Sequence, residues 1–332
     1  MSFEFSVIGG GAWGTAIANL LARFNKGKVI LWAKEKEVVK QINTDHINNK
    51  FLSEVKLEKN IFATEYLSEA IAPYIFYVTP AQNFRDTINK QKSFINDDIQ
   101  IIICSKGIEV SSGLLLSNVF TKELPNNNYS ILSGPSFANE VANDKPAALV
   151  LSSNNINNAI NLSNLISSKN FRLYPSDDIV GVQLGGAIKN VYAISSGIVK
   201  GLQYGENASA ALLTRAIAEM VKICISFGGK KESIFGLSGV GDILLTCTSE
   251  SSRNFILGKA LGEGEELINI ISNKHTIAEG YFTTKAIYNL VKSKNIDTPI
   301  LNAIYDILYN KSQPKDKAES LLNRPLKDKE FC

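Results

Sequence analysis

Short apolar runs alternate with longer amphipathic stretches through the first half of the chain. The runs predicted as β-strands are Glu4–Gly9, Val29–Trp32, Tyr74–Thr79, Ile99–Cys104, Ser130–Leu132 and Ala147–Leu151. Several are rich enough in Ile, Val or Tyr to be buried on both faces, which is typical of parallel sheets. Strands that alternate with helices form βαβ units. The pattern therefore predicts an α/β, Rossmann-type fold with a doubly wound, mostly parallel sheet.

The hydrophobic pattern changes beyond about Gly181. Runs typical of strands disappear, and Ala-, Leu- and Ile-rich segments such as Ala208–Phe227 and Thr283–Ser293 space their apolar residues as helices do. The chain has 332 residues, and a single hydrophobic core usually stops growing near about 250 to 300 residues. We therefore predict a Rossmann domain over residues 1–180 and an all-helical domain over residues 181–332.

Composition narrows the class of protein. The 35 basic and 32 acidic side chains nearly balance at a net charge of +3, and no dense run of Lys or Arg indicates a nucleic-acid surface. Four scattered cysteines and two histidines predict neither a metal site nor a disulfide framework. The start of the chain lacks a basic leader, and no apolar run approaches the about 18 residues of a membrane span. We expect a cytoplasmic protein.

A glycine motif, Gly9-x-Gly11-x-x-Gly14, directly follows the first predicted strand and opens an apolar helix over Thr15–Phe24. In dinucleotide-binding folds the first glycine permits a tight turn, the second lets the backbone approach the pyrophosphate, and the third allows close contact between helix and strand. The helix N-terminus adds backbone amides for the anion. The bare motif also fits an ordinary turn, but this placement favours cofactor binding.

The second strand ends beside Lys34 and Glu35, about 20 residues after the motif, where the ribose of the cofactor binds in such folds. A basic residue there suits the 2′-phosphate of NADPH, and an acidic residue suits the ribose hydroxyls of NADH. Lys34 therefore favours NADPH, although it could be an ordinary exposed lysine. Glu35 leaves NADH as the alternative cofactor.

One lysine and one asparagine, Lys189 and Asn190, stand among small and apolar residues in the segment Val182–Ala193. A lysine on an apolar helix face either extends its ammonium to water or is desolvated, which lowers its pKa towards values useful for proton transfer. The segment alone leaves both interpretations open. The other motifs of the chain must decide between them.

Polar clusters next to predicted turns indicate an anionic substrate that bears hydroxyl groups. Lys106 follows the strand Ile99–Cys104, so its ammonium should lie at the carboxyl edge of the sheet, where ligands of such folds bind. The other clusters are Ser133–Ala138, the glycine-rich loop Gly236–Asp242, and Ser249–Asn254, whose arginine could grip two phosphate oxygens. Solvated loop residues and helix N-caps would explain each cluster separately.

Taken together, these motifs resemble the bacterial NAD(P)-dependent glycerol-3-phosphate dehydrogenases nearly from end to end. The matching segments occur in the order and spacing of that family: Gly9–Ala16, Ser105–Glu109, Ser133–Ala138, Gly181–Asn190, Leu213–Arg215, Gly239–Asp242, Thr246–Thr248, Ser252–Asn254 and Glu279–Tyr281. The resemblance implies reversible reduction of dihydroxyacetone phosphate to sn-glycerol 3-phosphate, a precursor of phospholipids, by NADPH or NADH. It also implies a homodimer.

The resemblance assigns roles to particular residues. Lys189 would exchange the proton at the reacting oxygen, Asp242 would hold it charged and oriented, and Asn190 and Thr246 would support it. Lys106 would orient the substrate near the nicotinamide. The residues implied to contact the substrate are Lys106, Gly134, Ser136, Lys189, Asp242, Ser252, Arg253 and Asn254. Those implied to bind the cofactor are Gly9, Gly11, Ala12, Trp13, Gly14, Lys34, Lys106, Ala138, Arg253, Ile277 and Glu279.

Two positions depart from the commonest pattern of the family. Ala12 stands where serine is frequent, which removes one possible hydrogen bond to phosphate, and Lys34 stands where arginine or histidine is frequent.

Two other functions also remain open at this point. One is a related Rossmann dehydrogenase that acts on a hydroxyacid through a similar Lys-Asn pair, and the other is a cofactor-sensing protein without turnover.

Overall fold

The structure is a computed structural model that describes residues 2–25, 27–272 and 278–325. The chain forms two compact units. The first contains Met1–Lys106 and Leu114–Ile179, and the second contains Gly107–Gly113 and Val180–Cys332. The short segment Gly107–Gly113 thus belongs to the second unit, although it lies between two segments of the first in the chain. The hydrophobic pattern does not predict this.

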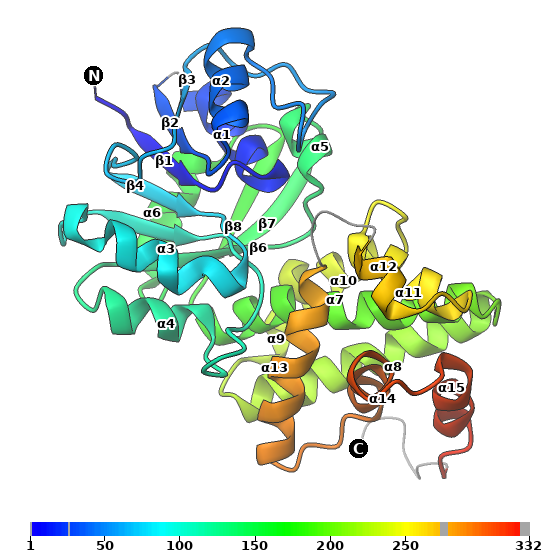
Figure 1. The fold of residues 1–332 in the computed structure, drawn as a ribbon. Helices are drawn as coiled ribbons and strands as arrows, with labels where there is room; N and C mark the ends of the chain where they lie inside the picture. The colour runs from blue at the N-terminus through cyan, green and yellow to red at the C-terminus, as the bar shows by residue number, and fades with distance from the viewer. Residues whose placement is uncertain (1, 26, 273–277, 326–332) are drawn as a thin grey trace. The chain divides into compact units, whose positions relative to one another are not determined.

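The first unit is built on one sheet of eight strands (Figure 1). The strands are β1 (Phe5–Ile8), β2 (Val29–Trp32), β3 (Ile61–Thr64), β4 (Tyr74–Tyr77), β5 (Gln100–Ile103), β6 (Tyr129–Ser133), β7 (Ala147–Ser152) and β8 (Phe171–Ser176). Their order is β3-β2-β1-β4-β5-β6-β7-β8. Neighbours pair in parallel except β6 and β7, which are antiparallel. The predicted mostly parallel sheet is confirmed.

Two strands were missed by the sequence prediction, and both lie at the edges of the sheet. β3 pairs only with β2, and its two central residues are half-buried. β8 pairs only with β7, alternates between buried and exposed positions and contains Pro175. An edge strand buries less side-chain surface than a central one and tolerates proline. Neither segment therefore shows the continuous apolar run by which the central strands are recognised.

Helices connect the strands of this sheet, and several of them pack directly against it. They are α1 (Ala12–Asn25), α2 (Lys36–Asp45), α3 (Phe84–Gln91), α4 (Leu116–Glu123), α5 (Ala138–Ala142) and α6 (Ile156–Ile166), with 3₁₀ turns η1 (Ala81–Asn83) and η2 (Lys92–Phe94). The core between helices and sheet includes Phe5, Leu31 and Phe76, all fully buried. Burial of such side chains stabilises the unit by about 1.5 to 3 kcal/mol each.

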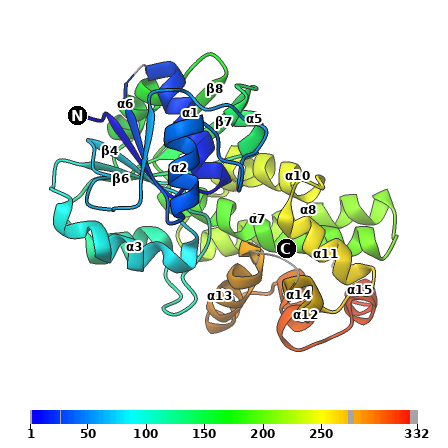
Figure 2. The same ribbon diagram turned by 45° about the horizontal axis from the view of Figure 1, so that its top comes forward.

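From Ile179 on, every regular element among the described residues of the second unit is a helix or a helical turn, as predicted (Figure 2). Its elements are α7 (Ile179–Gly201), α8 (Glu206–Ser226), α9 (Lys231–Phe235), the π-helical turn η3 (Leu237–Gly241), α10 (Asp242–Cys247), α11 (Arg253–Gly262), α12 (Leu267–Ser272), α13 (Glu279–Ser293), α14 (Pro299–Tyr309) and α15 (Pro314–Leu322). No described helix is both long and apolar enough to cross a membrane.

Helix α7 is the centre of the second unit, because every residue from Gly181 to Ile198 is buried. Such burial on all sides requires neighbours that approach closely. A Cβ atom at Gly185 would lie 2.6 Å from the backbone oxygen of Ser238, and one at Gly197 would lie 2.1 Å from the backbone oxygen of Phe255. Glycine at these positions therefore lets the backbones of η3 and α11 pack directly on α7.

Candidate active-site residues

Lys189 lies in the buried middle of α7, and only 9% of it is exposed. Its Nζ donates to Oδ1 of Asp242 at 2.5 Å and to Oγ1 of Thr246 at 2.7 Å. Asp242 and Thr246 stand one turn apart on α10, so both face the same side of that helix. The sequence left a solvated ammonium and a desolvated one open, and the structure shows the desolvated one, held by a carboxylate and a hydroxyl.

The glycine-rich segment before α10 brings Asp242 to Lys189. The glycine-rich sequence predicts a loop over Gly236–Asp242, but residues Leu237–Gly241 form a π-helical turn that leads directly into α10. This turn packs on Gly185, one helical turn before Lys189 on α7. π-helical turns are rare and frequently occur at functional sites. Here the turn aims the first residue of α10 at the lysine.

Asn190, the neighbour of Lys189, takes part in a separate buried hydrogen-bond chain. Its Oδ1 accepts from Nδ2 of Asn254 at 3.0 Å, and Oδ1 of Asn254 accepts from the backbone N–H of Gly280 at 2.9 Å. A Cβ atom at Gly280 would lie 2.6 Å from the backbone oxygen of Asn190. The chain therefore ties α7, α11 and the start of α13 together beside the lysine.

The Ser252-Arg253-Asn254 cluster divides into three different environments. Ser252 is buried and caps α11, because its side chain accepts from the backbone N–H of Phe255 at 3.3 Å. Asn254 is buried in the chain just described, whereas Arg253 is exposed at the first residue of the helix. A guanidinium on the N-terminal turn of a helix adds a bidentate donor to the backbone amides there, which together suit phosphate.

Cys247 is the other reactive side chain near the lysine. It is buried at the end of α10, and burial raises the pKa of its thiol to about 12, although the positive charge of Lys189 opposes this shift. The thiol therefore stays neutral near pH 7. Within the described part of this cluster, Lys189 is the better candidate for proton exchange.

In the first unit, Lys106 and two residues that follow β6 meet at one backbone oxygen. The ammonium of Lys106 donates to the carbonyl of Gly134 at 3.1 Å, and Oγ of Ser136 donates to the same carbonyl at 3.0 Å. Gly134 has a φ of 147°, and a Cβ atom there would lie 2.9 Å from Cα of Leu149. Only glycine suits this backbone. The structure thus brings together three predicted substrate residues of this unit.

The glycine motif adopts the geometry that a dinucleotide needs. Gly9 has a φ of 135°, and a Cβ atom on Gly14 would lie 1.8 Å from the backbone oxygen of Gly9, so α1 packs tightly on the turn. A Cβ atom on Gly11, by contrast, would have no neighbour within 4 Å. The surface above Gly11 is open at the N-terminus of α1, as required for the backbone to approach a pyrophosphate.

Trp13 and the other predicted cofactor residues differ in how they are placed. The indole Nε1 of Trp13 is buried without a hydrogen-bond partner in the described structure, so a bound group could satisfy it. Ala12 begins α1, Ala138 begins α5 and packs against the core, and Glu279 begins α13. Ile277 lies outside the described residues. The unpartnered indole of Trp13 and the open surface above Gly11 are features that fit a bound dinucleotide.

Three charged residues follow β2, and two of them form ion pairs. Lys34 is exposed, and its side chain makes no ion pair or hydrogen bond with any described residue. Oε1 of Glu35 lies 3.1 Å from Nζ of Lys50, and Oε2 of Glu65 lies 3.7 Å from Nζ of Lys36. Lys34 is therefore the cation of this group that is available to an anion.

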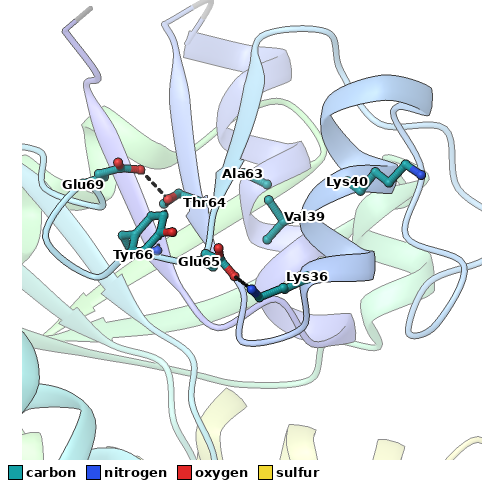
Figure 3. A pocket seen from close by; sticks show the side chains of 8 residues that line it. All are labelled: Lys36, Val39, Lys40, Ala63, Thr64, Glu65, Tyr66 and Glu69. Carbon is teal, nitrogen blue, oxygen red and sulfur yellow. Dashed lines mark hydrogen bonds and ion pairs between the residues drawn. The ribbon is translucent and has the colours of Figure 1, made fainter.

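A hollow of about 310 Å³ lies between α2 and the end of β3 and contains the Lys36–Glu65 pair (Figure 3). In the same hollow Oγ1 of Thr64 donates to Oε2 of Glu69 at 2.5 Å. These polar groups satisfy one another, and neither Lys34 nor the glycine motif lines the hollow. We therefore do not regard it as part of the candidate site.

Asn48, which the sequence does not single out, supports the glycine motif. Asn48 is fully buried, and its Nδ2 donates to the backbone oxygen of Gly10 at 2.9 Å and to Oγ1 of Thr15 at 2.8 Å. Its position in a polar, asparagine-rich stretch hides it, because such stretches usually form solvated loops. Only its burial distinguishes it from Asn43 and Asn49.

Comparisons with known proteins agree with the resemblance in the sequence. Residues 4–159 match the N-terminal part of NAD-dependent glycerol-3-phosphate dehydrogenase, and residues 178–319 match its C-terminal part. The glycerol-3-phosphate dehydrogenase [NAD(P)+] of Novosphingobium aromaticivorans is 41% identical over 98% of both chains. The crystal structure of glycerol-3-phosphate dehydrogenase from Coxiella burnetii superposes with a TM-score of 0.93 at 35% identity, covering 97% of this chain and 99% of that one. The enzyme from Saccharomyces cerevisiae is 26% identical with a TM-score of 0.83, covering 96% of this chain and 99% of that one.

Proposed function

Because the chain belongs to the NAD-dependent glycerol-3-phosphate dehydrogenase family, we propose that the residues described above perform one hydride-transfer reaction. The enzyme reduces dihydroxyacetone phosphate reversibly to glycerol 3-phosphate with NADH or NADPH. We propose that this product supplies the glycerol backbone of phospholipids. The buried cluster of Lys189, Asp242 and Thr246 is the observation that carries the assignment of roles.

The first unit would hold the cofactor. Gly9, Gly11 and Gly14 would accept the pyrophosphate at the start of α1, with Ala12, Trp13 and Ala138 beside them, and Lys34 would contact the adenosine ribose. The fit rests on the open surface above Gly11 and the unpartnered indole of Trp13. When bound, the reduced nicotinamide supplies the hydride that adds to C2 of the ketone. Glu279, Ile277 and Arg253 are the further cofactor residues that the resemblance to the family implies.

Lys189 would give its proton to the oxygen of that ketone. As the oxygen gains negative charge, an ammonium stabilises it and then protonates it, which leaves a neutral amine to be recharged by solvent. Asp242 balances the positive charge of Lys189 and orients it through the 2.5 Å contact, while Thr246 fixes the direction of a second N–H. Positioned proton transfer of this kind contributes typically about 10² to 10⁴ in rate.

The remaining polar residues would bind the rest of the substrate. Arg253 would grip the phosphate together with the amides at the start of α11, and Ser252 and Asn254 would support that turn through the cap and the amide chain. In the first unit, Lys106 would orient the substrate, with Gly134 and Ser136 beside its ammonium. Asn190 would hold α7 in place beside Lys189 through its hydrogen bond to Asn254.

The decisive experiment is an initial-rate assay of dihydroxyacetone phosphate with NADPH and with NADH, followed by absorbance at 340 nm. We expect oxidation of at least one coenzyme and formation of glycerol 3-phosphate. Oxoacids serve as the comparison, because preferential reduction of an oxoacid would indicate a hydroxyacid dehydrogenase. Binding of NADPH without oxidation by any ketone would indicate a cofactor sensor instead.

We also propose that the enzyme is a homodimer in the cytoplasm. The dimer rests on the family to which the chain belongs, and the location rests on the chemistry of the substrate and coenzymes. Light scattering of the purified protein gives its mass directly. A mass of one chain at micromolar concentration would contradict the dimer.

A further inference from the structure

The ion pair between Glu35 and Lys50 changes the charge that a cofactor would meet at the end of β2. In dinucleotide-binding folds a carboxylate at this place binds the ribose hydroxyls of NADH, whereas a basic residue accommodates the 2′-phosphate of NADPH. A bare Glu35 would repel that phosphate. Here the carboxylate oxygen lies 3.1 Å from Nζ of Lys50, so its charge is offset while Lys34 remains available.

Lys50 is held in this place by the turn on which it stands. Its neighbour Asn48 is fully buried and bonds the backbone oxygen of Gly10 and the hydroxyl of Thr15. Oδ1 of Asn48 also accepts from the backbone N–H of Phe51 at 3.3 Å, and Nζ of Lys50 lies 5.0 Å from the centre of the Phe51 ring. The turn that carries Lys50 is therefore anchored to the glycine motif, whereas an ordinary surface lysine stands on a segment without such anchors.

Two other lysines of this part of the chain have different partners. Lys36 pairs with Glu65, as Figure 3 shows, and Lys56 donates to the backbone oxygen of Asp45 at 2.6 Å. Lys50 is the one cation that the described residues place within ion-pair distance of Glu35. Removing it would leave a carboxylate beside the place where the 2′-phosphate of NADPH binds.

We propose that Lys50 is a specificity-determining residue that lets the enzyme accept NADPH by neutralising Glu35. The inference rests on the proposed binding of the cofactor ribose at the end of β2. With the Lys50–Glu35 pair intact, Lys34 can attract the 2′-phosphate without opposition from Glu35. Without Lys50, the same site favours the uncharged ribose hydroxyl of NADH.

The test measures the dissociation constants of NADPH and NADH by fluorescence titration, together with kcat/KM for both coenzymes, in Lys50→Met. We expect NADPH binding to weaken about fivefold, the effect of one unopposed charge at a contact distance in water. NADH binding should change by less than twofold. Lys56→Met is the matched control, because it removes an exposed lysine of the same segment that has no carboxylate partner among the described residues. The ratio of its two dissociation constants should stay unchanged.

A second variant separates neutralisation of Glu35 from direct contact with the phosphate. In Glu35→Gln there is no charge to offset, so adding Lys50→Met should no longer weaken NADPH binding. An equal loss in both backgrounds would overturn the proposal, since Lys50 would then bind the phosphate itself. Equal losses for NADPH and NADH would also overturn it, because Lys50 would then only support the turn.

The binding measurement keeps this proposal distinct from the proposed reaction. A chain that binds both coenzymes but reduces no dihydroxyacetone phosphate would contradict the reaction, while its two dissociation constants would still test Lys50. Thermal unfolding of each variant confirms that the titrated protein is folded.

Discussion

Nζ of Lys189 on α7 lies 2.5 Å from Oδ1 of Asp242 on α10, and both side chains are withdrawn from solvent. Removing two opposite charges from water costs several kcal/mol per ion, which the attraction between them repays only with good geometry and further hydrogen bonds. Thr246 provides one such bond at 2.7 Å. The protein thus maintains a costly arrangement at the centre of its second unit, as active sites commonly do.

Lys189→Ala should lower kcat by at least about 10², because it removes the proton donor, while the dissociation constant of the coenzyme stays within a factor of two. Steady-state kinetics and coenzyme titration measure the two effects. Lys200→Ala is the matched control, since Lys200 lies on the same helix but is exposed and pairs with Glu206 at the surface. Near-normal turnover of Lys189→Ala would exclude this lysine as the acid.

Asp242→Asn should lower the free energy of unfolding by about 3 to 5 kcal/mol, because it leaves the buried ammonium of Lys189 without its counter-charge. Urea denaturation measures the loss. The double variant Lys189→Met with Asp242→Leu removes both charges and should recover most of the stability without recovering activity. If the single and double variants were equally unstable, the unpaired charge of Lys189 would not be the cause of the instability of Asp242→Asn.

Arg253→Ala should raise KM for dihydroxyacetone phosphate, because it removes the bidentate donor at the start of α11. Loss of a charge-assisted hydrogen bond costs about 1.5 to 3 kcal/mol, which corresponds to roughly 10- to 150-fold in KM. The melting temperature should not change, since the side chain is exposed. Lys259→Ala removes a positive charge from the same helix as a control, and an equal effect on KM there would show that only net charge matters.

Glu219 should make stability depend on pH between about 4.5 and 7. Burial raises the pKa of its carboxyl from 4.5 to about 7, although the backbone amides of Ile300 and Leu301 and the hydroxyl of Tyr192 oppose the shift. A raised pKa means that the folded chain binds this proton more tightly than the unfolded chain does. The contribution of Glu219 to the free energy of unfolding is therefore complete below pH 4.5 and is lost as the pH rises through 7.

The expected size of this loss is about 3 kcal/mol, from the difference between the two pKa values. Urea denaturation at pH 5 and pH 7.5 measures most of this loss, and Glu219→Gln, which cannot ionise, should remove most of the difference between the two pH values. If the variant kept the full pH dependence of the native chain, another group would be responsible.

The central strands could be predicted from sequence because each is a run of apolar residues that is buried on both faces. The edge strands β3 and β8 could not, since their pairing with a single neighbour leaves one side of each open and relaxes the apolar pattern. The glycine motif could also be recognised, because its strand, turn and helix are contiguous in the chain. Asn48 could not, because its burial depends on how a polar turn folds back onto Gly10.

The sequence by itself determined the two fold classes, the nucleotide motif and, through the order of its motifs, the family and its candidate residues. These are properties of local periodicity, backbone permissiveness and spacing along the chain. Only the tertiary structure decided that Lys189 is desolvated, with partners 53 and 57 residues away, and that Lys50 rather than Lys36 pairs with Glu35. The energy of a charge depends on distance and burial, and both arise only when remote segments pack together.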